Sequence, residues 1–388
     1  MKNRRLSFLF FLVMFVIGTD TFLVSPLLPT LTHYYGISTS VSGFIVSSYA
    51  IGYMLTALIV GPISDNHDRK LILVVGLITF TLATAACGLA NTFPIMLFTR
   101  FVAGIAAASA GPQIWAAIPI LYPKDQVVKV MGYATSGLAI AQIIGVPLGS
   151  FLAGWSWRFP FFFVGGIALI LTILIMLYLP DIKTSTTDKT TSLNIYRHFF
   201  KNKPALKLLF SYLLFQTANF CAFSFIGTWF FKSFSLPVTA IGGFILIIGV
   251  GQFVGSLLGS RIVKLLTLPR AFFLEFVLFI FGYLILPFST SIIMATIILA
   301  LIYFIGGAIF PLFMSTLQAT APKERGTMSS LTNAAMYLGE AVGGAFGGIL
   351  IKNFPGFFGI SVFTAIGVFL AMLLYAQQGY FKENKSHS

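Results

Sequence analysis

Long apolar runs dominate this sequence and leave it few ways to fold. Twelve of them are long enough to cross a bilayer as a helix, which takes about 20 apolar residues. Of the 388 residues, 57% are hydrophobic and only 9% are charged, a composition that soluble globular proteins do not have. We therefore predict an all-α membrane protein with twelve transmembrane helices, at residues 6–31, 40–63, 71–91, 94–120, 129–153, 158–180, 206–231, 239–263, 271–289, 291–319, 326–351 and 356–377.

The chain divides into two similar halves. Its longest polar interval, residues 181–207, separates six apolar runs from six others. Glycines recur at one spacing in the fifth and eleventh runs, at Gly132, Gly145 and Gly149 and at Gly326, Gly339 and Gly343. Transporters are commonly built from repeated halves with the substrate site between them near the midplane. We predict two six-helix bundles, residues 1–180 and 206–388, joined by a cytoplasmic loop at residues 181–205.

The basic residues lie almost entirely on one side of the predicted membrane. That side receives both termini and the even-numbered loops, and it holds 20 of the 24 lysines and arginines. Because positive loops stay cytoplasmic, both termini and the central loop are predicted to be cytoplasmic. The formal net charge of +14 then reflects topology and not a nucleic-acid partner. We expect a multi-pass protein of a bacterial plasma membrane.

Cysteine and histidine give no sign of a metal site or a disulfide framework. Cys87 and Cys221 fall inside apolar runs, where reduced cysteine behaves as a small hydrophobic residue. All four histidines fall in loops or the tail, and the chain has no G-x-x-x-x-G-K-[ST] nucleotide-binding loop. We predict no metal, no cofactor and no direct use of ATP.

One aspartate lies inside the first apolar run. Asp20 is past the middle of residues 6–31, with no other charge in the run, and Pro26 and Pro29 follow it. A carboxylate at that depth costs a few kcal/mol by insertion scales, so it is expected to face a cavity or a partner. Asp20 is therefore our first candidate for a functional residue and the predicted proton site.

The loop after the second run carries a recognisable motif. Residues 61–70 read GPISDNHDRK, and four of them match the pattern G-x-L-x-D-R-x-G-R-[RK]: Gly61, Asp65, Arg69 and Lys70. Asn66 and Asp68 depart from it. This pattern resembles the major facilitator superfamily, and within it the twelve-helix drug:proton antiporters. The resemblance implies a cytoplasmic latch in which Asp65 meets a helix N-terminus and Arg69 pairs with an acid such as Asp125. The alternative is charge that only sets topology.

Two further motifs continue the resemblance. Residues 97–104 read LFTRFVAG and are similar to the family's L-x-x-R-x-x-x-G, with Arg100, Gly104 and Trp115 on one helical stripe. Arg100 is expected to meet Asp20, or else to snorkel to the outer interface. In the fifth run, Gly145, Pro147 and Gly149 resemble the antiporter motif G-x-x-x-G-P-x-x-G-G with the proline displaced. That version is also similar to the sugar- and nucleoside-efflux branch.

Other polar and aromatic residues inside the runs are candidates for a central site. Glu340 is central in the eleventh run, shares a face with Tyr337, and is a second candidate for proton coupling. The remaining candidates for a substrate cavity are Gln113, Trp115, Gln142, Gln216, Asn219 and Phe223. The alternative for each buried amide is a hydrogen bond between helices.

These features together predict a secondary transporter and not an enzyme. We expect proton-coupled efflux of small hydrophobic or cationic compounds such as drugs, by alternating access, from a chain that acts as a monomer in the lipid bilayer. The alternatives are export of a sugar, nucleoside or lipid-like metabolite, or uptake by symport. A membrane-embedded enzyme or sensor is a more distant alternative, since the runs hold no catalytic constellation and the chain has no soluble domain.

Overall fold

The structure is a computed structural model that describes residues 2–64, 68–182, 202–321 and 325–381. Those residues form helices and no strands. Twelve helices in the described part are long and apolar enough to cross a membrane, as the sequence predicts. The predicted division at residues 181–205 falls mostly outside the described part and remains a proposal.

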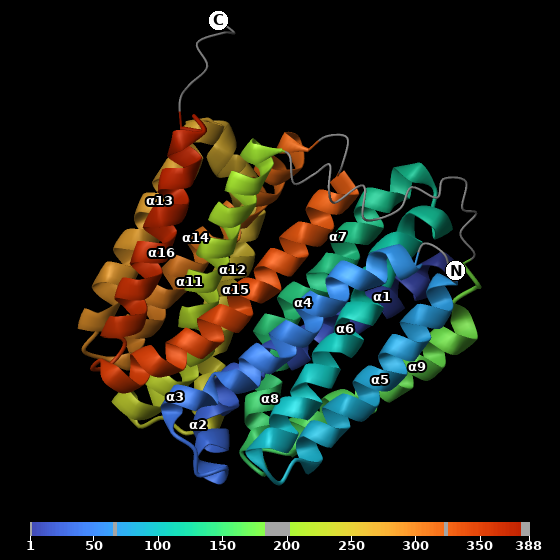
Figure 1. Ribbon diagram of the computed structural model, residues 1–388, viewed down its shortest axis with the longest axis horizontal. Coiled ribbons are helices and arrows are strands. Elements are labelled where there is room, and N and C mark those ends of the chain that lie inside the picture. Colours follow the sequence, from blue (N-terminus) through green and yellow to red (C-terminus); the bar gives the residue numbers. More distant parts are fainter. Residues whose placement is uncertain (1, 65–67, 183–201, 322–324, 382–388) are drawn as a thin grey trace, which may run out of the picture.

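The two halves form two bundles that lie side by side in Figure 1. We call the end at which α1 begins and α16 ends the terminal end, and the other the opposite end. The first half comprises α1 (Lys2–Phe22), α2 (Val24–Tyr34), α3 (Thr39–Ser42), α4 (Phe44–Ser64), α5 (Arg69–Leu89), α6 (Phe93–Leu121), α7 (Lys124–Ile140), α8 (Val146–Ala153) and α9 (Phe159–Tyr178). The second comprises α11 (Lys203–Phe234), α12 (Val238–Leu266), α13 (Leu268–Ile285), α14 (Ile292–Thr320), α15 (Arg325–Asn353) and α16 (Phe358–Gln377).

The first predicted helix is not continuous. The sequence predicts one helix over residues 6–31, whereas the structure has α1 and α2 with a break at Leu23. Pro26 lacks the N–H that the carbonyl of Phe22 needs in an unbroken helix, so the ladder is interrupted there. The break leaves Asp20 in the last turn of α1.

The fifth predicted helix also changes its winding. Between α7 and α8, residues Ala141–Gly145 form a π-helical turn, in which the Val146 N–H donates to the carbonyl of Ala141. The turn ends just before Pro147, which has no N–H to offer the carbonyl of Ile143. Such single π turns widen a helix locally and are frequent at functional sites. This one carries Gln142 and Gly145.

Glycines and serines join the halves at the opposite end. A Cβ at Gly43, where α3 passes into α4, would collide with the carbonyl of Gly344 in α15. The Ser25 hydroxyl in α2 donates to the Phe223 carbonyl in α11 at 2.7 Å, and the Ser47 hydroxyl donates to the Ala341 carbonyl at 2.6 Å. The two bundles therefore approach so closely at the opposite end that side chains and glycines of one contact the backbone of the other.

Candidate functional site

Asp20 and Arg100 form an ion pair inside the first bundle. The Arg100 Nη1 lies 2.8 Å from the Asp20 Oδ2, and Nη2 donates to the Asp20 backbone carbonyl at 3.4 Å. Their exposed fractions are 0% for Asp20 and 1% for Arg100. The contact that the sequence led us to expect is present, and Arg100 does not extend to an interface. Each charge offsets the burial of the other, which an isolated charge at this depth could not achieve.

Close packing between α4 and α6 holds Arg100 in place. A Cβ at Gly104 would collide with the backbone carbonyl of Tyr49, and a Cβ at Gly52 would collide with that of Phe101. At this short separation the Arg100 guanidinium lies over the Tyr49 ring, 4.3 Å from its centre. The Tyr49 hydroxyl in turn accepts a hydrogen bond from Thr21, the residue after Asp20, at 3.1 Å. The Arg100 guanidinium is thus oriented by the face of the Tyr49 ring, and the hydrogen bond from Thr21 holds that ring in place.

A series of tyrosines runs from this pair towards the second bundle. Tyr53, one turn after Tyr49, stacks on Tyr337 of α15 with ring centres 3.6 Å apart and planes 18° apart. Glu340 follows Tyr337 by three residues, and its side chain is almost fully buried, with an exposed fraction of 2%. The rings therefore form a contact between the halves, with Asp20–Arg100 at one end and Glu340 at the other.

A cavity of about 250 Å³, which we call the central cavity, lies between the two bundles. Six of the residues proposed from the sequence line it: Gln142, Gln216, Asn219, Phe223, Tyr337 and Glu340. Asp20 and Arg100 do not line it, although Gly18, Thr21 and Phe22 beside Asp20 do. The ion pair therefore lies behind the cavity wall.

Gln113 and Trp115 of α6 also lie outside the central cavity. Gln113 is buried, and neither atom of its amide has a hydrogen-bond partner among the described residues. Trp115 is half-buried and packs against the hydrophobic core. Trp115 shares a helical stripe with Arg100 and Gly104, which packs against α4 at Gly104, whereas Gln113 lies on another face of α6.

The structure adds residues that sequence reasoning missed. Gln252 of α12 and Tyr303 of α14 line the central cavity, and Tyr49 and Tyr53 connect it to the ion pair. Gln252 is a single amide in a glycine-rich apolar run, the same signal that selected Gln142. Tyr49 and Tyr53 lie four residues apart on one helix face, which is a detectable pattern of polar rings in an apolar run.

The repeated glycines occupy equivalent positions in the two bundles. A Cβ at Gly145 would collide with the Thr19 side chain of α1, and a Cβ at Gly339 would lie 2.8 Å from the Thr217 nitrogen of α11. In both bundles the fifth spanning helix thus approaches the first through the same glycine of the repeat. Gly149 lies beside Leu23, and Pro147 lies against Gly242 of α12, across the boundary between halves.

The motif loop between α4 and α5 is only partly described. Gly61 lies in the last turn of α4, and Asp65, with its expected contact to a helix N-terminus, is outside the described residues. Lys70 forms an exposed ion pair with Asp181 at 3.3 Å. Asp68, which replaces the family's glycine, accepts hydrogen bonds from the Lys70 and Ile182 N–H groups, at 2.9 Å and 3.1 Å. The pairing of Arg69 with Asp125, an exposed residue in the first turn of α7, stays a prediction.

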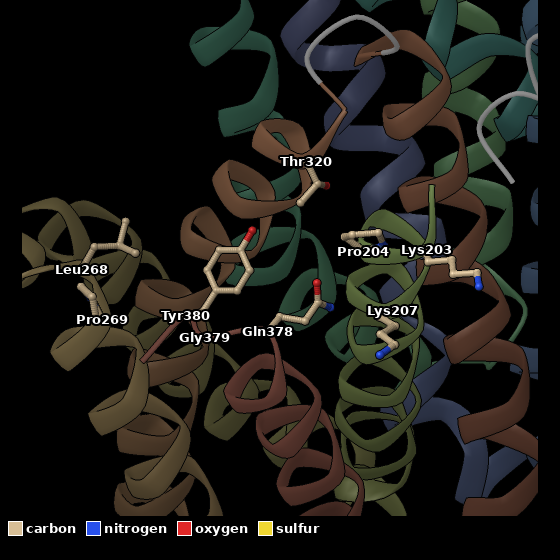
Figure 2. A pocket seen from close by; sticks show the side chains of 9 residues that line it. All are labelled: Lys203, Pro204, Lys207, Leu268, Pro269, Thr320, Gln378, Gly379 and Tyr380. Atoms are coloured by element: carbon tan, nitrogen blue, oxygen red, sulfur yellow. The ribbon is translucent and has the colours of Figure 1, made fainter. Parts of the chain in front are cut away.

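A second, larger hollow of about 710 Å³ lies at the terminal end of the second bundle. Figure 2 shows Lys207 of α11, Thr320 at the end of α14, and Gln378 and Tyr380 just after α16 around it. None of its lining residues belongs to the set proposed from the sequence. The described residues contain no group of three or more His, Cys, Asp or Glu that could hold a metal ion.

The family model of the Major Facilitator Superfamily matches residues 10–344. The chain belongs to the Major Facilitator Superfamily. A transporter superfamily of this kind moves solutes without transforming them, so the protein is a transporter and not an enzyme.

Two curated superfamily relatives differ in how much of the chain they match. A protein of Bacillus subtilis (strain 168), described as "Uncharacterized MFS-type transporter YceJ", is 44% identical over 95% of this chain and 94% of its own length. The quinolone resistance protein NorA of Staphylococcus aureus is 28% identical over 48% of each chain.

Solved structures of the superfamily share the fold. A D-xylose-proton symporter superposes with a TM-score of 0.81 over 97% of this chain and 98% of its own, at 16% identity. The nucleoside transporter NupG superposes with a TM-score of 0.74 over 98% of this chain and all of its own, also at 16% identity. At such low identity these neighbours support the twelve-helix architecture alone.

Proposed function

We propose that this protein exports small hydrophobic or cationic compounds in exchange for protons. The observation that carries the proposal is the buried Asp20–Arg100 pair directly behind the wall of the central cavity. An ionisable group inside a membrane span indicates an ion or proton pathway by default. The likeness to NorA over half of the chain supports a drug as the exported compound.

The proton cycle that we propose uses alternating access. The halves are in contact at the opposite end, and the positive-inside count favours that end as the outer one, with both termini in the cytoplasm. Asp20 takes up a proton when the site opens outwards and releases it when the site opens inwards, where the cavity receives a substrate. Rocking of the two bundles alternates these states. The electrical part of the driving force is about 2.3 kcal/mol per charge per 100 mV.

The lining of the central cavity favours binding of a compact, largely apolar substrate. Phe22 and Phe223 lie edge to face there with ring centres 5.6 Å apart, and Phe223 also contacts Tyr303. Phe215, Phe220 and Phe310 complete an aromatic lining. Ligand sites are typically apolar with a few placed polar groups, which matches this arrangement.

The experiment that tests this proposal compares wild type with Asp20→Asn in inverted membrane vesicles. Wild-type vesicles are expected to accumulate a fluorescent drug only with a proton gradient, and the neutral variant is expected to lose this accumulation almost completely. The substitution keeps the side-chain volume while removing the charge. Proton-driven accumulation that persists in Asp20→Asn vesicles would eliminate Asp20 as the proton site.

A second candidate substrate class is a sugar or nucleoside. Four amide side chains line the central cavity, Gln142, Gln216, Asn219 and Gln252, and amides donate to and accept from hydroxyl groups. Gln216 donates to the Tyr212 hydroxyl at 2.7 Å, so its amide orientation is held. The same vesicles loaded with labelled sugars or nucleosides discriminate the two classes, and the direction of accumulation discriminates export from uptake.

A further inference from the structure

Glu340 differs from the other residues of the central cavity. Among the described residues that line the cavity, it is the only Asp, Glu, Lys, Arg or His. Its Oε2 is buried and has no hydrogen-bond partner among the described residues. Burying an ionised carboxyl group without a partner is strongly unfavourable. A proton or a bound cation removes that cost.

The backbone on both sides of Glu340 is tightly held. Gly339 packs against α11 so closely that a Cβ would lie 2.8 Å from the Thr217 nitrogen. The Ala341 carbonyl accepts the Ser47 hydroxyl of α4 at 2.6 Å. Neither the helix nor its register can shift to carry the carboxyl group out of the cavity while these contacts last. Glu340 is therefore presented to the cavity by a rigid element.

Among the described residues, the positive charge that acts on Glu340 is that of Arg100. The titratable side chains on the elements packed against this part of α15 include Tyr49 and Tyr53 of α4, Tyr212 and Cys221 of α11 and Tyr303 of α14, which are neutral at physiological pH in their ordinary states. Arg100 lies beyond the tyrosines and already pairs with Asp20 at 2.8 Å. A cation that enters the cavity would therefore supply a charge partner for Glu340.

We propose that Glu340 recognises the positive charge of the substrate and exchanges it for a proton, while Asp20 has no contact with the substrate. This inference rests on the proposed export function. When a monovalent organic cation binds, the O–H bond of the Glu340 carboxyl group breaks, the proton passes to cavity water, and the carboxylate pairs with the cation. Charge is conserved, because one positive charge replaces another. The aromatic walls add cation–π attraction.

The test uses purified full-length protein and N-methylquinolinium, a compact aromatic cation with a fixed charge. Calorimetric titration in two buffers of different ionisation enthalpy counts the protons released per bound cation. Wild type is expected to release up to about one proton, with affinity that falls by as much as about tenfold per pH unit under acid conditions. Glu340→Gln is expected to bind at least about tenfold more weakly, without proton release and without dependence on pH.

Quinoline, uncharged at neutral pH, serves as the neutral probe. Its binding is expected to be equal in wild type and Glu340→Gln, which separates loss of charge recognition from collapse of the cavity. Glu275→Gln is the matched control, because Glu275 of α13 is also a buried carboxyl group but does not line the central cavity. This control variant is expected to bind N-methylquinolinium as wild type does.

Three outcomes would overturn this assignment. One is unchanged proton release in Glu340→Gln, and another is a wild type that binds N-methylquinolinium no better than quinoline. The third is loss of proton release on binding in Asp20→Asn, which would give the exchange to Asp20 instead. Failure of the proposed export function is a separate result, since it is read from vesicle accumulation and not from binding.

Discussion

At the scale of single residues, the molecule separates a buried ion pair from a buried acid without a partner. Asp20 is neutralised by Arg100 in its own bundle, whereas Glu340 faces the central cavity from the other bundle. We therefore expect the two acids to respond differently to a change of partner. Removing Arg100 should perturb Asp20 directly, whereas Glu340 should respond to what occupies the cavity.

Arg100→Ala is expected to move the pH optimum of transport upwards. The variant removes a positive charge 2.8 Å from the Asp20 carboxyl group, so the ionised form of Asp20 loses its main stabilisation. A higher pH is then needed for proton release. We expect a displacement of about one pH unit or more, equivalent to about 1.4 kcal/mol per unit, in pH-dependent efflux from vesicles.

Arg100→Lys provides the control for that displacement. Lysine restores the charge without the planar guanidinium group, so part of the wild-type profile is expected to return. The variant also loses the bonding to the Asp20 carbonyl and part of the stacking on Tyr49. An unchanged pH profile in Arg100→Ala would mean that Asp20 titrates without any influence from Arg100.

At the scale of helices, the glycines decide how near one element comes to another. Gly52 and Gly104 bring α4 and α6 into backbone contact, and this contact places Tyr49 against Arg100. Gly145, the last residue of the π turn, lets α1 approach through the Thr19 side chain. Without a strong hydrophobic force between helices in lipid, such close packing is a main source of their association.

Gly104→Ala is expected to destabilise the protein by about 1–3 kcal/mol, because the added methyl group meets the Tyr49 backbone carbonyl and α4 has to shift. Thermal unfolding of the purified protein measures the effect. Gly166→Ala in α9 is the matched control, since a Cβ there meets nothing within 4 Å. That variant is expected to be neutral or slightly stabilising. Equal melting temperatures for the two variants would contradict this account of the α4–α6 contact.

Helix number and the Asp20–Arg100 contact were predictable from the sequence, whereas the neighbours of most other residues were not. Apolar length determines a spanning helix, and a buried charge requires an opposite charge. The two faces of α6 that carry Gln113 and Trp115 have no such requirement, and helical periodicity does not tell which neighbour a face meets. The stacking of Tyr53 on Tyr337 depends on residues 284 positions apart in different bundles, so no local pattern indicates it.

At the scale of the whole molecule, the two bundles meet at the opposite end through small residues. Gly43 and Gly344 lie at the closest approach, with Ser25 and Ser47 donating across the boundary nearby. The central cavity lies deeper between the bundles. In the alternating-access cycle that we propose, this arrangement corresponds to the state with the opposite end shut.

Gly43→Ala is expected to hold the opposite end open, because its methyl group would collide with the Gly344 carbonyl in the closed state. Transport should fall by about tenfold or more, while reagents added from the outer side should label cysteines placed along α2 faster than in the parent protein. Gly243→Ala in α12, where a Cβ meets nothing within 4 Å, should leave both properties unchanged. Slower labelling in Gly43→Ala would exclude this steric explanation.

The serine contact at the opposite end has an energetic consequence. The Ser47 hydroxyl lies 2.6 Å from the Ala341 carbonyl and also 3.2 Å from the Gly43 carbonyl of its own helix. When the bundles separate, the hydroxyl keeps an acceptor, and the helical carbonyl of Ala341 keeps the N–H of the following turn. Parting the halves at this contact leaves neither group without a hydrogen bond, so the contact itself adds little to the free energy of opening. We expect a closure built from such contacts to part and re-form many times on a modest driving force.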